Sequence, residues 1–346
     1  MGGKWFKMEQ KNVLITGGGG FLGQVISKKC VERGDRVWSF SRRNHSNLSG
    51  MGVTQIQGDV ADENAINKAC EGKDLVFHLA ARMGLWGRFS TYYKTNVKGT
   101  RNVIAACKMA GVPVLVYTSS TSVIMDNTGH YLPIGGRYPE KFGSNYAMSK
   151  AFAEQAVIRA ADQDLRCAIL RPHMIWGPGD MSGGPSFLRE RRWIVKIGNG
   201  MNSVSGIYID NAAHAHLLAA DKVALDPSLS GKTFFLAQDD PFLLWDFIER
   251  IQQWSGQKRI IGAIPYTVAM NISGMMEWVY KSSCIKSTPF LTRNLVGELS
   301  GFHVFDTKAL NNELGFSPEI SVDTGLEIYQ KWLKKEYPAM GKRGAA

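Results

Sequence analysis

Short apolar segments alternate with longer segments of helical periodicity through the first half of the chain. Such alternation is typical of a parallel sheet whose strands are joined by crossover helices, and it predicts an α/β fold of the doubly wound type. The predicted strands cover residues 13–16, 37–40, 53–57, 75–79, 114–118 and 167–170. The predicted helices between them cover residues 21–33, 63–70, 92–110 and 147–161.

A glycine-rich turn connects the first predicted strand to the first predicted helix. It reads TGGGGFLG over residues 16–23 and matches both GxGxxG, starting at Gly18, and GxxGxxG, starting at Gly17. Gly20 and Gly23 complete either spacing. Glycines allow a tight turn and let backbone N–H groups approach a pyrophosphate at the positive end of a helix. In this strand–turn–helix context the turn predicts a dinucleotide-binding domain of the Rossmann type; a merely structural turn is the alternative.

The end of the second predicted strand indicates which dinucleotide binds. An NAD-preferring domain carries an acidic residue there, which accepts hydrogen bonds from the adenosine ribose. This strand instead ends in Ser41, Arg42 and Arg43, whose hydroxyl and guanidinium groups suit the extra phosphate of NADP. Two solvated surface arginines are the alternative. We therefore expect NADP, with NAD as the second option, and we expect Asp59 to accept from the adenine amine.

A second motif carries candidate chemistry. Tyr146 and Lys150 lie four residues apart at the start of a predicted helix, so the phenol and the ammonium share a face. A free phenol titrates near pH ~10 and needs a nearby cation to act as an acid or base at neutral pH. The fifth strand ends in a run of hydroxyl residues from Ser119 to Ser122, which can bring a hydroxyl to the same place. A surface helix pair is the alternative, because this spacing often occurs by chance.

These residues resemble the extended short-chain dehydrogenases/reductases, and within them the 3β-hydroxysteroid dehydrogenase/isomerase-like branch. The resemblance extends over nearly the whole chain. The shared motifs are TGGGGFLG at residues 16–23, FHLAA at 77–81, NVKGT at 96–100, YTSS at 117–120, YAMSK at 146–150, LRP at 170–172, WGPGD at 176–180 and YIDNAA at 208–213. The segments GLWGRFSTYYKTNVKGT and LRPHMIWGPGD look most like bacterial members of this branch that reduce 2-alkyl-3-oxo acids in olefin biosynthesis.

The resemblance implies a role for each residue of the site. Tyr146 is the general acid/base, and Lys150 holds the nicotinamide ribose and lowers the pKa of Tyr146. Ser120 hydrogen-bonds the substrate oxygen, with Ser119 as the second choice. Asn96 positions a helix or a water near Lys150, unless it is a helix cap. No metal is required, because hydride passes to the carbonyl carbon while Tyr146 protonates the oxygen. The residues expected at the cofactor are Gly17, Gly20, Phe21, Leu22, Gly23, Ser41, Arg42, Arg43, Asp59, Val60, Leu79, Ala80, Ala81, Tyr146, Lys150 and Pro172.

The expected function is therefore an NADP-dependent reductase that transfers hydride to the ketone of a hydrophobic 2-alkyl-3-oxo acid. The alternatives are an NAD-dependent dehydrogenase of 3β-hydroxysteroids or sterol 4-carboxylates, a sugar-nucleotide epimerase or dehydratase, and a nucleotide-sensing protein without catalysis. The missing acidic residue argues against NAD, and the apolar loops argue against a sugar. The intact Ser120, Tyr146 and Lys150 argue against a sensor.

Two loops carry the candidate substrate contacts, namely Met83, Trp86, Arg88 and Trp176. Their apolar side chains predict an apolar pocket, in which an arginine binds a carboxylate of the substrate. Packing of loop against loop is the alternative.

The longest charge-free run, at residues 260–276, is broken by glycine, proline and polar residues, so we predict no transmembrane helix. Ile264, Val268, Ile272, Met275 and Val279 fall at helical spacing. A core helix is the favoured interpretation. A lid over a hydrophobic substrate and shallow insertion into a membrane surface are the alternatives.

After residue 171 the alternation loosens, and glycine- and proline-rich segments at residues 177–180 and 183–185 predict loops. We therefore divide the chain into an NAD(P)-binding Rossmann domain at residues 1–172 and a substrate-binding region at 173–346. Within this region we expect helices at 242–254 and 322–335, and a strand at 231–236 that returns to the sheet.

The composition limits the partners and the compartment. The 41 basic and 30 acidic residues give a net charge of +11, which we attribute to a solvated surface and not to nucleic-acid binding. Five cysteines without a CxxC pair, and no leader-like apolar stretch before residue 12, predict a cytoplasmic protein, with peripheral membrane contact as an option. The expected partners are a small hydrophobic substrate and a second copy or a biosynthetic complex. We interpret His78, His173, His214 and His216 as structural.

Overall fold

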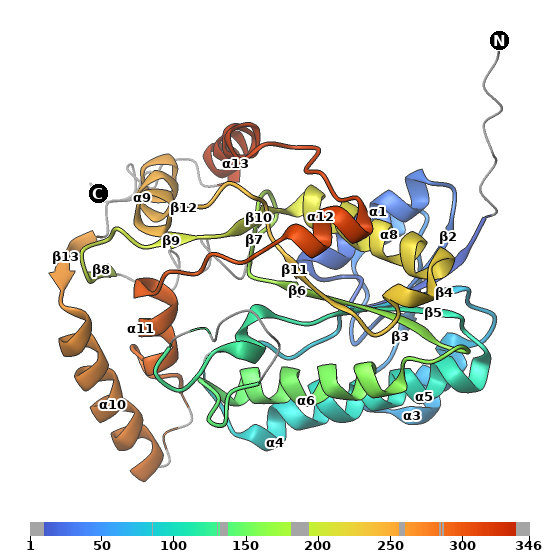
Figure 1. Cartoon of the computed structure of the whole chain (residues 1–346), viewed down its shortest axis with the longest axis horizontal. Coiled ribbons are helices and arrows are strands. Elements are labelled where there is room, and N and C mark those ends of the chain that lie inside the picture. The colour runs from blue at the N-terminus through green and yellow to red at the C-terminus, as the bar shows by residue number, and fades with distance from the viewer. Residues whose placement is uncertain are drawn as a thin grey trace, which may run out of the picture.

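A seven-stranded parallel sheet forms the centre of the protein in a computed structural model (Figure 1). The structure describes residues 10–336 except 85, 130, 132–137, 181–193, 256–259, 284 and 286. The strand order is β11-β6-β5-β4-β1-β2-β3. These strands are β1 (Asn12–Thr16), β2 (Arg36–Ser41), β3 (Thr54–Gln57), β4 (Leu75–His78), β5 (Val114–Thr118), β6 (Arg166–Pro172) and β11 (Thr233–Leu236).

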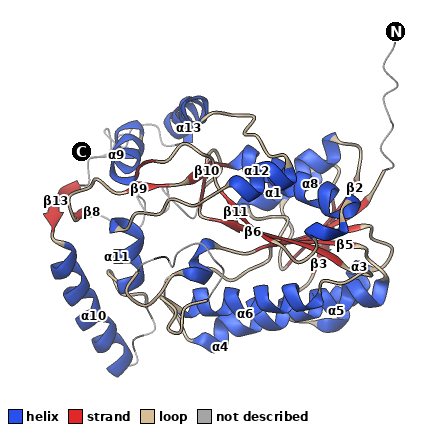
Figure 2. Cartoon of the chain, in the orientation of Figure 1, coloured by secondary structure: helices blue, strands red, loops and turns tan. Residues whose placement is uncertain are grey.

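The strands are apolar on both faces because helices cover both faces of the sheet. In β1, Val13 and Ile15 pack into one apolar cluster, and Leu14 packs into a second cluster on the opposite face. Figure 2 shows the helices as two layers with the sheet between them. Helices α1 (Phe21–Glu32) and α8 (Ile209–Leu225) form one layer, and α3 (Glu63–Cys70), α5 (Gly99–Ala110) and α6 (Asn145–Ala160) form the other. The predicted Rossmann-type fold is confirmed.

One predicted helix is divided. The segment expected as a single helix from residue 92 to 110 consists of α4 (Phe89–Tyr92), the π-helix η1 (Tyr93–Lys98) and α5. A π-helical turn is wider than an α-helical turn and commonly marks a functional site. Asn96 lies in η1 and is therefore not a helix cap.

The second half of the chain adds smaller elements at the carboxyl end of the sheet, and β11 returns to pair with β6, as expected. Three two-stranded sheets pair β10 with β7, β12 with β9 and β13 with β8. Their strands are β7 (Met174–Trp176), β8 (Ile194–Ile197), β9 (Ser203–Val204), β10 (Gly206–Tyr208), β12 (Phe242–Leu243) and β13 (Ile260–Ile264). The remaining helices are α2 (Ser46–Ser49), η2 (Thr121–Ile124), η3 (Pro227–Leu229), α9 (Leu244–Trp254), α10 (Tyr266–Ser282), α11 (Arg293–Ser300), α12 (Lys308–Leu314) and α13 (Val322–Glu336).

The division between residues 172 and 173 stays a prediction, since a strand from the second segment completes the sheet of the first. The loop predicted at residues 183–185, most of the N-terminal segment and Cys284 lie outside the described residues.

The core-helix interpretation of the charge-free run is wrong. Ile264 ends strand β13, and in α10 only Ala269 and Ser273 are buried among the residues that the structure describes. The apolar side chains of α10 are largely exposed instead, with Trp278 at 68% and Met275 at 62%. Helix α10 extends along one end of the molecule (Figure 1). In the described part of the chain, no helix combines the length and the apolar character that crossing a bilayer would require.

Candidate active site

The glycine-rich turn lies between β1 and α1, as predicted. Gly17 has φ +74°, a left-handed conformation that favours glycine, and its carbonyl oxygen accepts a 2.9 Å hydrogen bond from the amide of Gly20. A Cβ at Gly17 would lie 3.0 Å from the backbone of Ala80, and one at Gly23 would lie 2.4 Å from the carbonyl oxygen of Gly17. The turn is therefore packed too tightly for side chains at Gly17 and Gly23.

This turn fits the pyrophosphate of a dinucleotide. Gly20 is the N-cap of α1 and forms no side-chain capping hydrogen bond, so the turn meets the helix N-terminus through backbone alone. The first amides of α1, which include those of Phe21 and Leu22, are the groups that such an anion would contact. Other residues predicted to contact the cofactor lie in the loop that follows the neighbouring strand β4. Leu79, Ala80 and Ala81 follow β4, and the amides of Leu79 and Ala80 are held by Thr16.

The predicted adenosine contacts lie at the carboxyl ends of β2 and β3. Ser41 is the last residue of β2, and Arg42 and Arg43 follow it with exposed side chains. Asp59 follows β3, and its carboxylate accepts from the amide of Ala61 and lies 3.9 Å from the Lys94 ammonium. Val60 is buried beside Gly99. Both the phosphate-binding and the solvated interpretation of the two arginines fit this exposure.

Ser120 and Tyr146 come together at the end of β5. Ser144 caps α6 by accepting a 3.1 Å hydrogen bond from the amide of Ala147, and this places Tyr146 in the first turn of the helix. Burial raises the pKa of Tyr146 to about 12, and a hydrogen bond from Ser120 to the phenol oxygen acts in the opposite direction. Of the two candidate serines, Ser120 is thus the one that contacts the phenol.

Lys150 lies behind this pair and is 2% exposed. Its Nζ donates a 2.7 Å hydrogen bond to the carbonyl oxygen of Thr118 and lies 4.3 Å from the ring centroid of Tyr117. Burial lowers the pKa of Lys150 to about 7, and the negative charge of Glu154 acts in the opposite direction.

The expectation that Lys150 lowers the pKa of Tyr146 stays a prediction. The groups that shift the phenol are Ser120, Glu298 and Tyr92, and the largest cause is burial. The ammonium is directed at a backbone carbonyl of β5 instead of the phenol.

Asn96 connects the loop that follows β4 to helix α6. Its amide oxygen accepts a 2.7 Å hydrogen bond from the amide of Arg82, and its amide nitrogen donates to the carbonyl oxygen of Arg82 at 3.0 Å. The same nitrogen donates to Oγ of Ser149 at 2.8 Å. This geometry fits the helix-positioning interpretation, because Ser149 precedes Lys150 on α6.

A buried ion pair behind Lys150 was not predicted. Arg171 donates to both oxygens of the Glu154 carboxylate at 3.0 and 2.6 Å, and the phenol of Tyr138 donates to the same group at 2.7 Å. A signal was present in the sequence, since Glu154 follows Lys150 by four residues and so shares its helix face. The partner Arg171 comes from β6 and has no such local signal.

The predicted substrate residues divide into two groups. Met83 and Arg88 are exposed, and Trp86 is half-buried, with its ring 6.5 Å from that of Tyr280 in α10. The phenol of Tyr92 holds the loop by donating to the carbonyl oxygens of Gly84 and Trp86.

Trp176 does not lie on this loop surface. It is 1% exposed and packs against Tyr208, Phe242, Phe247 and Tyr329, so its prediction as a substrate contact is wrong. The side chain fills the apolar core beneath β7 and β10.

The histidines interpreted as structural include His78. Its ring is held between Thr16 and Thr100, and burial lowers its pKa to about 3.

Known proteins resemble this chain in sequence and in fold. The model of the 3-beta hydroxysteroid dehydrogenase/isomerase family matches residues 14–260. The 2-alkyl-3-oxoalkanoate reductase of Stenotrophomonas maltophilia (strain K279a) is 38% identical over 319 residues, which cover 91% of this chain and 97% of that protein. The decarboxylating sterol-4-alpha-carboxylate 3-dehydrogenase of Mus musculus is 30% identical over 329 residues, which cover 92% and 89%.

Among solved structures, UDP-glucuronic acid 4-epimerase from Bacillus cereus in complex with NAD has a TM-score of 0.68 at 20% identity. That alignment covers 94% of this chain and 99% of the epimerase, and it supports the fold. The family match spans more than half of the chain, and the bacterial reductase aligns over nearly its whole length. The chain belongs to the 3-beta hydroxysteroid dehydrogenase/isomerase family.

Proposed function

We propose that this protein is an NADP-dependent reductase that transfers hydride to the ketone of a hydrophobic 2-alkyl-3-oxo acid. The observation that carries the proposal is the arrangement of Ser120, Tyr146 and Lys150 at the carboxyl end of β5, on a chain 38% identical to a 2-alkyl-3-oxoalkanoate reductase. NADPH, when bound, would supply the hydride.

The chain's own residues hold the ketone and move its proton. The hydroxyl of Ser120 donates to the ketone oxygen and orients it toward the phenol of Tyr146. As negative charge develops on that oxygen, the Tyr146 hydroxyl transfers its proton to it, and an alcohol results. Lys150 holds the ribose side of the cofactor. The pKa of about 12 in the structure suits a phenol that keeps its proton until the ketone accepts it.

The surroundings of the substrate loop support an apolar substrate. Trp86 lies edge-on to Tyr280, with the Lys281 ammonium 5.6 Å from its ring centroid, so the end of α10 contacts the loop. The exposed apolar face of α10 fits the lid interpretation. A wholly apolar cavity of about 170 Å³ lies between β8 and β13 on one side and α10 and α11 on the other.

The decisive experiment follows the oxidation of NADPH, with NADH in parallel, by the purified chain. Its substrates are a long-chain 2-alkyl-3-oxo acid and, separately, 3-ketosteroids. We expect turnover of the oxo acid with NADPH preferred. Turnover of steroids alone, or a preference for NADH, would support instead the sterol-type dehydrogenase, a function carried by the mouse relative.

The variant Tyr146→Phe serves as the control for catalysis. We expect its turnover to fall about 10²- to 10⁴-fold, because it cannot supply a proton, while the Kd for NADPH stays within about twofold. Unchanged turnover would overturn the role of Tyr146, and loss of NADPH binding would mark a folding defect.

Location and assembly extend the proposal. We propose a cytoplasmic protein that forms a dimer through α5 and α6, with α10 free to contact a membrane surface or a partner of a biosynthetic complex. The exposed apolar side chains of Met109 and Phe152 on these two helices support the dimer. Sedimentation of the purified chain tests it.

A further inference from the structure

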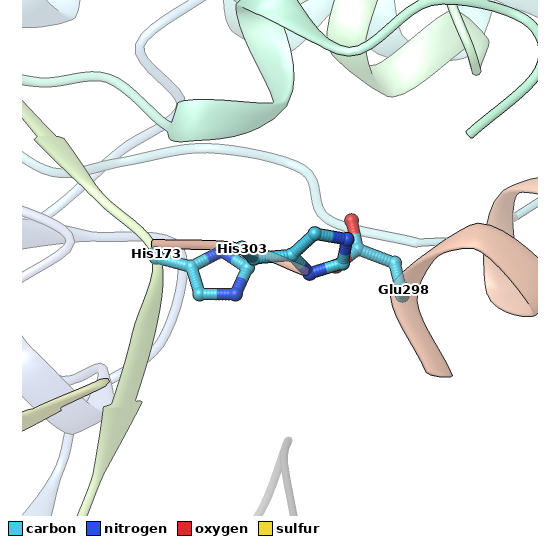
Figure 3. Close-up of side chains that lie close together, drawn as sticks. All are labelled: His173, Glu298 and His303. Atoms are coloured by element: carbon cyan, nitrogen blue, oxygen red, sulfur yellow. The ribbon is translucent and has the colours of Figure 1, made fainter. Parts of the chain in front are cut away.

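Three metal-ligating side chains from distant parts of the chain meet beside the catalytic residues. His173 lies between β6 and β7, Glu298 lies in α11, and His303 follows α11. One ligand atom of each lies within 4.8 Å of the others. Figure 3 shows the two imidazoles next to the carboxylate. The reductase chemistry proposed above uses none of these side chains.

The backbone around His303 is fixed on both sides. Its amide donates to the carbonyl oxygen of Ser203 at 2.9 Å, and its carbonyl oxygen accepts from the amide of Ser205 at 2.7 Å. The residue is 2% exposed. A position held this firmly presents the imidazole without the entropy loss of ordering a mobile side chain.

Outer hydrogen bonds orient the other two groups. Oγ1 of Thr121 lies 3.1 Å from Nδ1 of His173, which leaves Nε2 for a ligand. The phenol of Tyr131 donates to Oε1 of Glu298 at 3.1 Å, and Oε2 lies 3.8 Å from Nδ1 of His303. Such outer contacts are typical of protein metal sites, where they fix the ring and carboxylate that bind the ion.

Aromatic rings surround the cluster. The ring of Tyr131 lies 4.6 Å from that of His303, and Phe305 lies 5.2 Å from His173. Among the described residues, no lysine or arginine forms an ion pair with Glu298. With both imidazoles neutral and Glu298 ionised, a divalent cation would change the net charge of the three side chains from −1 to +1.

We infer that His173, Glu298 and His303 form a binding site for a divalent transition-metal ion of the zinc type. Two imidazole nitrogens and one carboxylate oxygen suit Zn²⁺ or Co²⁺, and such a set leaves a fourth position for another ligand. Ca²⁺ and Mg²⁺ prefer sites built of oxygen alone and bind here more weakly.

The location of this site suggests how a bound ion would act on the substrate. Thr121 follows Ser120, and His173 follows Pro172, so the site adjoins the ketone side of the active site. A bound ion adds positive charge there and attracts a carboxylate. Holding the carboxylate of a 3-oxo acid is the consequence that rests on the proposed function, whereas metal binding itself does not.

The test titrates the chelator-treated, tag-free full chain with Co²⁺ and then Zn²⁺. We expect one Co²⁺ per chain, with the visible absorption bands of a four- or five-coordinate ion, and displacement of Co²⁺ by Zn²⁺. His303→Gln and Glu298→Gln should each weaken Zn²⁺ binding at least about tenfold, and Thr121→Val should weaken it less. Circular dichroism and NADPH binding verify that each variant folds.

Two control variants make the test decisive. His214→Gln, in a half-exposed histidine that pairs with Glu319, should leave the stoichiometry and affinity unchanged. Tyr146→Phe should bind Zn²⁺ like the wild type, so a failed reductase assay and a failed metal site are told apart. The inference is overturned if the chain binds no stoichiometric Co²⁺, or if His303→Gln binds Zn²⁺ as tightly as the wild type.

Discussion

The Lys150 ammonium donates a 2.7 Å hydrogen bond to the backbone carbonyl oxygen of Thr118, and this contact joins the end of β5 to α6. Thr118 is the last residue of β5, and Ser120 lies two residues beyond it. The amine that shares a helix face with Tyr146 therefore also anchors the strand end that carries Ser120. This arrangement buries the Lys150 ammonium, and removing a charged group from water costs free energy.

That cost predicts a pH dependence of stability. The pKa of Lys150 is lowered by burial from its ordinary 10.5 to about 7, so between these pH values the unfolded chain binds more protons than the folded chain. Stability should therefore rise with pH across this window. We expect the free energy of unfolding of the wild type to increase relative to Lys150→Met between pH 7 and pH 9, by up to about 1.4 kcal/mol per pH unit.

Urea unfolding at several pH values measures this difference. Lys98→Met, which removes an exposed lysine from η1, is the matched control and should differ from the wild type by a constant amount. A constant difference for Lys150→Met as well would contradict the prediction.

The ion pair between Arg171 and Glu154 predicts a large loss of stability from a single change. Arg171→Met leaves the fully buried Glu154 carboxylate without its charge partner, and we expect unfolding to become about 3–5 kcal/mol easier. The double variant Glu154→Met with Arg171→Met should be more stable than Arg171→Met alone. Chemical denaturation checks both values, and equal stability of the single and double variants would count against a buried charge as the cause.

The Asn96 amide predicts an effect on substrate binding as well as on stability. Asn96→Ala removes the hydrogen bonds that join Arg82 to Ser149, and we expect a loss of about 1–3 kcal/mol of stability. Because the loop after Arg82 carries Trp86, kcat/KM for the ketone should also fall roughly tenfold to a hundredfold.

Asn102→Ala separates these two effects. Asn102 lies in α5 and donates to the carbonyl oxygen of Val60, so its loss should lower stability while KM for the ketone stays unchanged. Steady-state kinetics at saturating NADPH give the comparison. An equal rise of KM in both variants would show that Asn96 acts only through stability.

The exposed Arg42 and Arg43 predict the preference between the two dinucleotides. Replacing both by alanine removes two guanidinium groups from the end of β2, and each charge-assisted hydrogen bond to a phosphate contributes about 1.5–3 kcal/mol. We expect KM for NADPH to rise at least about tenfold, while KM for NADH changes less than about twofold. Arg36→Ala, at the opposite end of the same strand, is the control. Equal effects on both cofactors would assign the two arginines to the solvated surface.

The sheet was predictable from the sequence because its strands are buried on both faces and read as short apolar runs. The strand at residues 114–118 has the predicted bounds, and β1 differs from its prediction by one residue. The π-helix was not predictable from periodicity. Its polar Asn96 is buried through contacts with Arg82 and Ser149, which lie in other elements.

The candidate site was predictable to the extent that its residues form local motifs. Tyr146, Lys150 and the glycine turn each depend on spacings of a few residues along one helix or turn. Glu298 and Tyr131, in contrast, are separated by 167 positions and meet only through tertiary packing. Trp176 was predicted to contact the substrate but is buried. Its motif indicates the path of the backbone near the cofactor but not the direction of the side chain.

The position of β11 in the sequence determines when the sheet is completed during synthesis. Among the described strands, β11 is the outer neighbour of β6, yet it begins at Thr233, long after β6 ends at Pro172. While the chain is being synthesised, β6 therefore exposes a row of unpaired N–H and C=O groups until the residues of β11 leave the ribosome. An open edge of this kind is a template for pairing with other chains, and β11 removes it when it joins the sheet.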